Sequence, residues 1–346
     1  MPHSLTDRKE IEEALSWLNR YWNRPAEPAF YDAKTVDEAV SLLAGYHGEA
    51  KIIAGGIDLL GLMKNEVLSP AVLVNIKNIP FMDGIEENSE GLKIGVLARI
   101  HDIERSSILK ENYPLLHEVA HSIGSPQIRN MATLGGNLCQ EVRCWYYRRS
   151  PSTGISFICR RKKEGKPCYA VNGENENHAI FGEGECVAIS PSDMATGLFA
   201  LDARINTMSS RGERVIPIRS FYTPLGHILE PEEIIISVSV PKVRPQTRQN
   251  FLKFRARKAI DFSTISVSSV ITSVNGSIRD ARIVVGGVSP LPYEAVAAEQ
   301  ILIGKSMKET IAEKAAEAAV SDATPLSKNG YKVPLVKALI KRSILE

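Results

Sequence analysis

The sequence of 346 residues predicts an α+β protein. Short apolar strands alternate with amphipathic helices from Phe30 to Pro126, and this alternation is typical of α/β patterning. After residue 241 strands come first and helices follow, as in an α+β domain. Between these parts, at 140–186, lies a charged segment with few apolar residues. We therefore expect an α/β-patterned domain, an inserted segment, and a C-terminal α+β domain of antiparallel sheet and helices.

Residues 1–27 are predicted to form an N-terminal extension helix. Apolar side chains recur there at helical spacing, and charged residues occupy the other face. The apolar positions are Ile11, Leu15, Leu18 and Trp22.

Residues 28–90 are predicted to form the first subdomain of the α/β-patterned domain. A helix is expected at 36–43, and apolar strands are expected at 51–56 and 71–76. The strand at 51–56 runs into a pair of glycines, which indicates a tight turn at its end.

Residues 91–240 are predicted to form the second subdomain. It begins with a strand at 91–96, continues through a helix near 112–123, and reaches a glycine turn at 135–136. The segment at 140–186 is an insertion within this subdomain. Because it has little apolar content, we expect something other than a hydrophobic core to hold it together.

Residues 241–346 are predicted to form the C-terminal domain. A loop is expected at 241–250. The strands that follow are expected at 262–274 and 279–288, and the helices at 292–303, 307–320 and 333–344.

All five cysteines fall within one stretch of 48 residues. Disulfide frameworks suit small secreted domains, so clustered thiols in a long chain favour a metal centre or redox chemistry over scattered buried thiols. The spacing lacks the paired CxxC motifs of structural zinc sites, whereas four thiolates can hold a [4Fe–4S] cluster. The cysteines are Cys139, Cys144, Cys159, Cys168 and Cys186.

Basic residues are frequent in the same region. They either offset the charge of thiolates and a cluster or form a solvated surface, and the sequence leaves both readings open. These residues are Arg143, Arg148, Arg149, Arg160, Arg161, Lys162 and Lys163. His178 is the one histidine inside the segment, and a polar surface position is the usual role of a loop histidine.

Two glycine turns are candidate anion sites. The first, at 52–61, lets backbone N–H groups approach an anion such as a pyrophosphate, although a plain turn between strand and helix is equally consistent. The second, at 132–138, offers further donors in the Thr133 hydroxyl, the glycine backbone and the Asn137 amide. Neither turn fits GxGxxG, so a Rossmann dinucleotide site is not predicted.

Composition narrows the possible partners. The net charge of +2 gives no reason to expect nucleic acid, and no apolar run approaches the roughly 20 residues of a membrane span. Acidic residues near the start replace the apolar core of a signal peptide, so a cytoplasmic location is expected, with export alongside a signal-bearing partner left open. No GxSxG or HExxH motif is present, and no catalytic residue is predicted.

Five motifs, in order, resemble the FAD-binding subunit of the molybdenum hydroxylase family, the xanthine dehydrogenase and carbon monoxide dehydrogenase group. The resemblance covers about residues 28–346. It implies a two-subdomain FAD-binding domain that is not a Rossmann fold, followed by a C-terminal flavoprotein domain. The motifs are AGGIDL (54–59), SPQIRNMATLGGNL (125–138), SPSDMA (190–195), KFRARKAIDF (253–262) and RIVVGGVSPLP (282–292).

In that family the two glycine turns hold the FAD pyrophosphate. The family's first turn usually reads AGGTD, and Ile57 here replaces the threonine, so a hydroxyl contact is lost while the backbone cradle can survive. By the resemblance Asp193 contacts the cofactor, Ile235 and Lys253 line the site, and Ile123 packs near the isoalloxazine. The implied FAD-binding residues are Ile53, Ala54, Gly55, Gly56, Ile57, Asp58, Leu59, Ile123, Thr133, Leu134, Gly135, Gly136, Asn137, Asp193, Ile235 and Lys253.

The cysteine-rich insertion is similar to that of a subset of the family. Those members resemble 4-hydroxybenzoyl-CoA reductase and a bacterial periplasmic aldehyde oxidoreductase, whose flavin subunits hold a [4Fe–4S] cluster. The comparison leaves Cys139, directly after the second glycine turn, as the spare cysteine. It implies that the cluster ligands are Cys144, Cys159, Cys168 and Cys186.

The resemblance implies an electron-transferring subunit of an oxidoreductase. FAD links one-electron clusters to a two-electron donor or acceptor, such as NAD, ferredoxin or quinone. The implied partners are a molybdopterin-binding large subunit and a [2Fe–2S] small subunit, in a heterotrimer that can itself dimerise. The organic substrate and the direction of electron flow stay open, so a reductase-like member and an aldehyde or xanthine dehydrogenase-like member are both consistent. The rival classes are a free-standing FAD-dependent oxidase and a non-enzymatic metal-binding protein.

Overall fold

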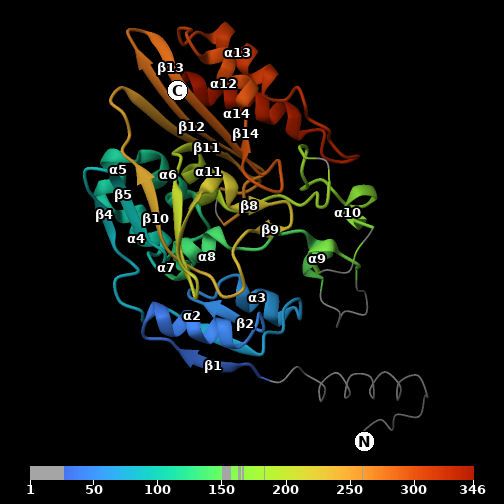
Figure 1. Cartoon of the computed structure of the whole chain (residues 1–346). Helices are drawn as coiled ribbons and strands as arrows, with labels where there is room; N and C mark the ends of the chain where they lie inside the picture. The colour runs from blue at the N-terminus through green and yellow to red at the C-terminus, as the bar shows by residue number, and fades with distance from the viewer. Residues whose placement is uncertain (1–26, 150–156, 163–164, 166, 183, 259) are drawn as a thin grey trace, which may run out of the picture.

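The computed structural model describes residues 27–149, 157–162, 165, 167–182, 184–258 and 260–346. The predicted extension helix, apart from residue 27, and Lys163 of the basic run lie outside these described residues. The described chain forms mixed helices and sheets, so the predicted α+β class is confirmed. Besides a two-stranded sheet of β8 (Tyr222–Thr223) and β9 (Gly226–His227), the described chain has three larger sheets. Figure 1 shows these larger sheets stacked along the molecule, with the first at the bottom and the C-terminal sheet at the top.

The first sheet is a small parallel sheet in the order β1-β3-β2. Thr35 begins the helix that covers it, because its side chain accepts a hydrogen bond from the Glu38 N–H and satisfies a free donor of the first turn. A second, shorter helix follows the first glycine turn. The elements are β1 (Ala29–Asp32), α2 (Val36–Gly45), β2 (Ala50–Ile53), α3 (Leu59–Lys64) and β3 (Val72–Asn75).

The second sheet is antiparallel, in the order β4-β5-β10-β6-β7. Its central strand, β10, returns from far along the chain to pair with β5 on one side and β6 on the other. The strands are β4 (Ile85–Glu87), β5 (Gly91–Gly95), β6 (Arg204–Ser209), β7 (Gly212–Pro217) and β10 (Ile234–Pro241).

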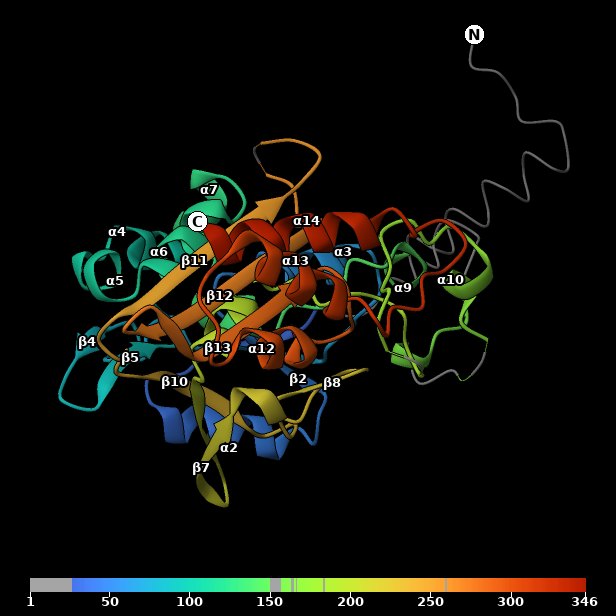
Figure 2. The same ribbon diagram turned by 90° about the horizontal axis from the view of Figure 1, so that it is seen from above.

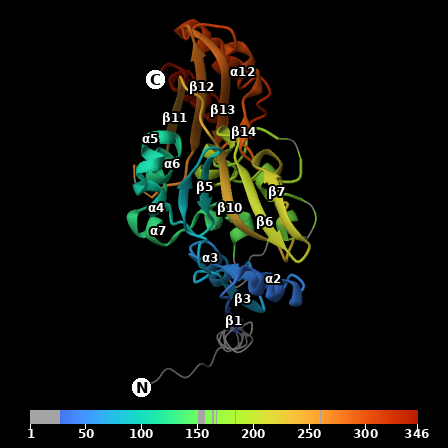
Figure 3. The same cartoon turned by 60° about the vertical axis from the view of Figure 1, so that its left-hand side comes forward.

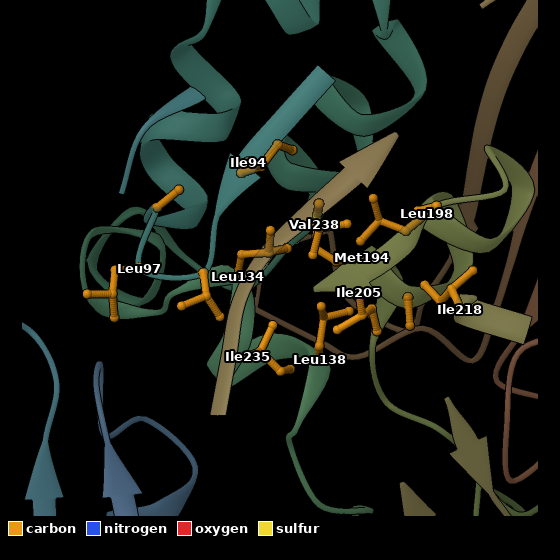
Figure 4. Close-up of a cluster of buried hydrophobic side chains, with 14 of the residues drawn as sticks. Ile94, Leu97, Leu134, Leu138, Met194, Leu198, Ile205, Ile218, Ile235 and Val238 are labelled. Carbon is orange, nitrogen blue, oxygen red and sulfur yellow. The ribbon is translucent and has the colours of Figure 1, made fainter. Parts of the chain in front are cut away.

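Six helices of the described chain accompany this sheet, and the second glycine turn opens one of them. Figure 3 shows four of them, α4 to α7, on one side of the sheet. The helices are α4 (Ile100–Arg105), α5 (Ser107–Asn112), α6 (Pro114–Ser122), α7 (Pro126–Met131), α8 (Leu134–Leu138) and α11 (Asp193–Ala200). Apolar side chains from β5, β6, β10, α8 and α11 meet in a single buried cluster (Figure 4).

The C-terminal sheet is antiparallel, in the order β11-β12-β13-β14. On one face α12 and α14 contact the sheet and α13 packs against these two helices, as Figure 2 shows. On the other face α6 and α11 contact the sheet, so it is covered on both sides. The predicted loop at 241–250 is wrong in its second half, because β11 begins at Thr247 and pairs with β12 along its whole length. The elements are β11 (Thr247–Phe254), β12 (Ile265–Val274), β13 (Ser277–Gly286), β14 (Tyr293–Glu294), α12 (Val296–Leu302), α13 (Glu309–Ala318) and α14 (Lys332–Leu345).

The cysteine-rich segment lies at one side of the molecule, where Figure 1 shows α9 and α10 beside the sheets. Its last part is not thinly hydrophobic, since Ile180 and Phe181 are buried in the core of the C-terminal domain. The part around the cysteines shares only a small apolar cluster, which includes Leu62 of α3. Its elements are α9 (Trp145–Arg148), the 3₁₀ turn η2 (Arg160–Lys162) and α10 (Tyr169–Asn172). No helix in the described chain has the length and apolar character of a bilayer crossing.

Candidate cofactor sites

The two predicted glycine turns lie against each other. A Cβ atom added to Gly55 would come within 2.1 Å of the Met131 carbonyl oxygen and 3.2 Å of the Ala132 Cα. Only glycine permits this approach of two backbones. Gly56 follows with φ of +71°, a left-handed conformation that turns the chain from β2 toward α3. The structure therefore brings 55–56 and 131–132 into direct contact.

The first turn presents backbone donors that are free within the described chain. The N–H groups of Gly55, Gly56 and Ile57 have no acceptor among the residues described. The Ile57 side chain, which replaces the usual threonine, is 47% exposed. Consecutive unpaired N–H groups around a left-handed glycine form a concavity that suits an anion. The departure at Ile57 therefore leaves the backbone cradle intact.

The second turn has fewer free donors than the sequence predicted. The Gly135 N–H donates to the Val96 carbonyl at 2.9 Å, and the Gly136 N–H donates to the Thr133 hydroxyl at 3.2 Å. The Asn137 N–H also stays inside the turn, bonded to the Thr133 carbonyl. In the described chain, the donors of the second turn that have no acceptor are the Thr133 N–H, the Thr133 hydroxyl and the Asn137 side-chain NH₂. Within the candidate cradle most of the free backbone donors thus lie in the first turn.

Asp58 joins the first glycine turn to the cysteine-rich segment. Its carboxylate accepts from Arg143 NH1 at 2.6 Å, from Arg148 NH2 at 2.7 Å and from the Glu141 N–H at 2.8 Å. Burial lowers the pKa of Arg143 to about 10, and the Asp58 charge opposes that shift. Two members of the predicted basic run are therefore partners of one carboxylate rather than a solvated surface.

Asp193 and Lys253 form a buried ion pair. The Lys253 ammonium lies 2.7 Å from Asp193 Oδ2, and both side chains are at most 7% exposed. Ser263 and Ser266 donate to the other carboxylate oxygen, at 2.5 and 3.1 Å. Lys253 also donates to the carbonyl of Ser122, directly before Ile123. Two residues implied by the resemblance thus meet, and Lys253 also bonds the residue before a third, Ile123.

The remaining residues implied to bind FAD are apolar. Ile235 is 4% exposed and packs in the core near Leu138, as Figure 4 shows, so its contact with a cofactor stays a prediction. Leu134 is buried in the same core. The others, Ile53, Ala54 and Leu59, flank the first turn and are half-buried.

Four cysteines line one cavity. Cys144, Cys159, Cys168 and Cys186 all lie on the wall of this cavity, together with His178. Cys139 does not line it, and burial raises the pKa of that thiol to about 12. In the described chain no three of these groups converge closely enough to hold a single ion. Four separated thiols around one cavity suit a cube that takes one thiolate per iron.

Several groups lie within hydrogen-bonding distance of these sulfur atoms. His178 Nε2 lies 3.3 Å from Cys144 Sγ, and Cys186 Sγ accepts from Arg161 Nε and the Ala188 N–H, both at 3.4 Å. Burial raises the pKa of the Cys144 thiol to about 11 and also raises the pKa of Cys159. Uncompensated thiolates are thus disfavoured there, and a positively charged group would be needed to stabilise them.

Sequence reasoning missed two of these donors. His178 was expected on a polar surface, but it is 5% exposed and lines the cavity, and burial lowers its pKa to about 4. Arg161 was one of seven undifferentiated basic residues, and its side chain is 5% exposed. The residues next to Arg161 in the sequence do not indicate that it is buried. Its contacts come from other segments of the chain, at Glu141, Cys186 and 224–225.

Comparison with known proteins places the chain in a family. Residues 25–243 match the FAD binding domain in molybdopterin dehydrogenase, and residues 250–346 match the CO dehydrogenase flavoprotein C-terminal domain. The aldehyde oxidoreductase FAD-binding subunit PaoB of Escherichia coli K12 is 33% identical over 307 residues, which cover 86% of this chain and 91% of that protein. The xanthine dehydrogenase FAD-binding subunit of Escherichia coli O157:H7 is 27% identical over 328 residues, covering 92% and 95%.

A solved structure of a carbon monoxide dehydrogenase has the same fold as this chain. Carbon monoxide dehydrogenase from Hydrogenophaga pseudoflava, in a form lacking the Mo-pyranopterin moiety, superposes with a TM-score of 0.75 at 25% identity, covering 93% of this chain and 97% of the other. The chain therefore belongs to the family of FAD-binding medium subunits of the molybdenum hydroxylases. The predicted family and the predicted oxidoreductase class are both confirmed.

Proposed function

We propose that this chain transfers electrons within a molybdenum-hydroxylase-type complex, with FAD at the two glycine turns and a [4Fe–4S] cluster in the cysteine-lined cavity. The observation that carries the proposal is the convergence of Cys144, Cys159, Cys168 and Cys186 on one cavity beside the flavin turns. Asp58 contacts both regions, which supports a common function for them.

The residues present fit the pyrophosphate of FAD. The free N–H groups of Gly55, Gly56 and Ile57 would bind it, and the Asn137 amide would add a side-chain donor. Gly55 excludes any side chain from the contact between the turns. The Asp193–Lys253 pair would orient the site from the C-terminal side. When bound, FAD supplies an exchange between one-electron and two-electron partners.

The residues present also fit a cluster. Each of the four thiols can supply one thiolate to one iron, and Arg161, His178 and the Ala188 amide would donate to the sulfur atoms. The surrounding apolar cluster is small, so binding energy at the metal would stabilise the fold of this segment.

The proposed partners follow from the relatives. Several relatives are medium chains or subunits of complexes by name, among them the carbon monoxide dehydrogenase medium chain of Hydrogenophaga pseudoflava. We propose that this chain likewise assembles with a molybdopterin-binding large subunit and a [2Fe–2S] small subunit, in the cytoplasm. An external donor or acceptor such as NAD, ferredoxin or quinone would exchange electrons with it.

Replacing each cysteine with serine tests the cluster assignment. Iron content should fall sharply in the Cys144, Cys159, Cys168 and Cys186 variants, because each removes one ligand from a four-ligand site. Cys139→Ser is the matched control and should keep its iron, since Cys139 lies outside the cavity. Flavin should persist in all five variants. Normal iron in any of the four, or a wild-type chain that purifies with flavin and no iron, would refute the cluster and favour a simpler flavoprotein.

A further inference from the structure

Arg161 is a buried cation fixed against one wall of the cysteine-lined cavity. Its side chain is 5% exposed, and its Nε donates to Cys186 Sγ at 3.4 Å. NH1 donates to the Leu225 carbonyl at 3.2 Å, and NH2 donates to the Pro224 carbonyl at 2.9 Å. These contacts hold the planar guanidinium in one orientation, with Nε directed at the sulfur.

Glu141 fixes Arg161 from the side of the flavin turns. Its carboxylate accepts from Arg161 NH1 at 3.0 Å, and its own N–H donates to Asp58 at the first glycine turn. The Glu141 side chain is 32% exposed, so water screens its charge more than it screens that of Arg161. Glu141 therefore offsets the charge of Arg161 only in part.

We propose that Arg161 is a positioning residue that raises the reduction potential of the cluster bound at this cavity. The inference rests on the proposed cluster site. A one-electron reduction adds one negative charge to the cluster, and a buried cation with a hydrogen bond to a ligand sulfur stabilises the reduced state more than the oxidised one. The other donor to Cys186, the Ala188 backbone N–H, carries no net charge.

The test is a potentiometric titration of the purified full-length chain with its cofactors, reduced by dithionite and followed by the electron paramagnetic resonance signal of the reduced cluster. Arg161→Gln removes the charge, and Arg161→Lys keeps a charge but loses the directed Nε–H donor. Lys162→Gln is the matched control, because it removes a positive charge from the same 3₁₀ turn at a residue that does not line the cavity.

The reduction potential of the cluster should become more negative in Arg161→Gln and, by a smaller amount, in Arg161→Lys. Lys162→Gln should keep the wild-type reduction potential. A wild-type potential in either Arg161 variant overturns the proposal, and so does an equal shift in Lys162→Gln, which would point to net charge alone. If Arg161→Gln assembles no cluster, Arg161→Lys decides. Failure of both to assemble would mean that Arg161 builds the site rather than tunes it, which also overturns the proposal. A wild-type chain without iron would instead refute the cluster site itself.

Discussion

Replacing Gly55 with alanine tests whether contact between the glycine turns shapes the flavin site. The added methyl group would lie 2.1 Å from the Met131 oxygen, 3.0 Å from its carbonyl carbon and 3.2 Å from Ala132 Cα. A Cβ atom in a folded protein essentially never comes within 3.0 Å of such an atom, so one turn must move by at least 0.9 Å, the difference between 3.0 and 2.1 Å.

The cost should be large for a single methyl group. Overpacking in a close-packed region typically costs about 1–3 kcal/mol. Here the opposing atoms belong to the backbone and cannot rotate away, so we expect about 3 kcal/mol, at the upper end of that range. The displacement also moves the free N–H groups of Gly55 and Gly56, so flavin should be lost together with stability.

Gly61→Ala is the matched control, because it makes the same change a few residues further along. A Cβ atom at Gly61 meets nothing within 4 Å, and the residue lies inside α3, so alanine should stabilise the protein by about 0.5–1 kcal/mol. Denaturant unfolding and the flavin absorbance of the purified chains measure both effects. If Gly55→Ala retained full flavin and wild-type stability, the contact between the turns would not have the role assigned here.

Three further predictions concern charged groups. Asp58→Asn weakens charge-assisted hydrogen bonds worth about 1.5–3 kcal/mol each, so it should lower both the iron and the flavin content of the purified chain. Asp202→Asn, at a carboxylate that is 57% exposed, is the control and should change neither content. Unchanged iron content in Asp58→Asn would contradict the prediction. Lys253→Met leaves the Asp193 charge buried without its partner, so the free energy of unfolding should fall by about 3–5 kcal/mol. Adding Asp193→Asn to this variant should recover part of that loss. If the losses of the two single variants simply added in the double variant, the ion pair would not have the predicted role. Burial raises the pKa of Glu299 from 4.5 to about 7, so its contribution to stability is present below pH 4.5 and is lost as pH rises through 7. Each pKa unit corresponds to about 1.4 kcal/mol, and this figure is discounted here because Glu299 is partly solvated. Glu299→Gln should therefore reduce the change in the free energy of unfolding between pH 4.5 and 7 by about 1–2 kcal/mol. An unaltered pH dependence in this variant would refute the raised pKa of Glu299.

Local patterns were sufficient for elements whose own residues show an amphipathic face or a continuous apolar run. The helix expected at 36–43 is α2, Val36–Gly45, because its buried face and its Thr35 cap are both visible in the sequence. The strand expected at 71–76 is β3, Val72–Asn75, which has three buried residues in succession. In these elements the residues that decide the structure are neighbours in the sequence.

Patterns failed where structure depends on distant pairing. β11, Thr247–Phe254, mixes polar and apolar residues, and seven of its eight side chains are half-buried, so it shows no alternation that would mark a strand. Its order comes from pairing with β12 at every residue. Likewise the cysteines indicated a metal centre, but the contact of Arg161 with Cys186 joins residues 25 positions apart, and no local pattern encodes it.

The same limit explains the role of Asp58. The resemblance placed this residue among those that bind FAD, whereas its carboxylate accepts three hydrogen bonds from the cysteine-rich segment. Glu141 extends the contact, because its backbone bonds Asp58 and its side chain bonds Arg161, which in turn reaches Cys186. A continuous chain of polar contacts therefore joins the first glycine turn to a sulfur atom of the cavity. These contacts give a physical route by which occupancy of the cavity and occupancy of the glycine turn can affect each other, and any such coupling is reciprocal in free energy.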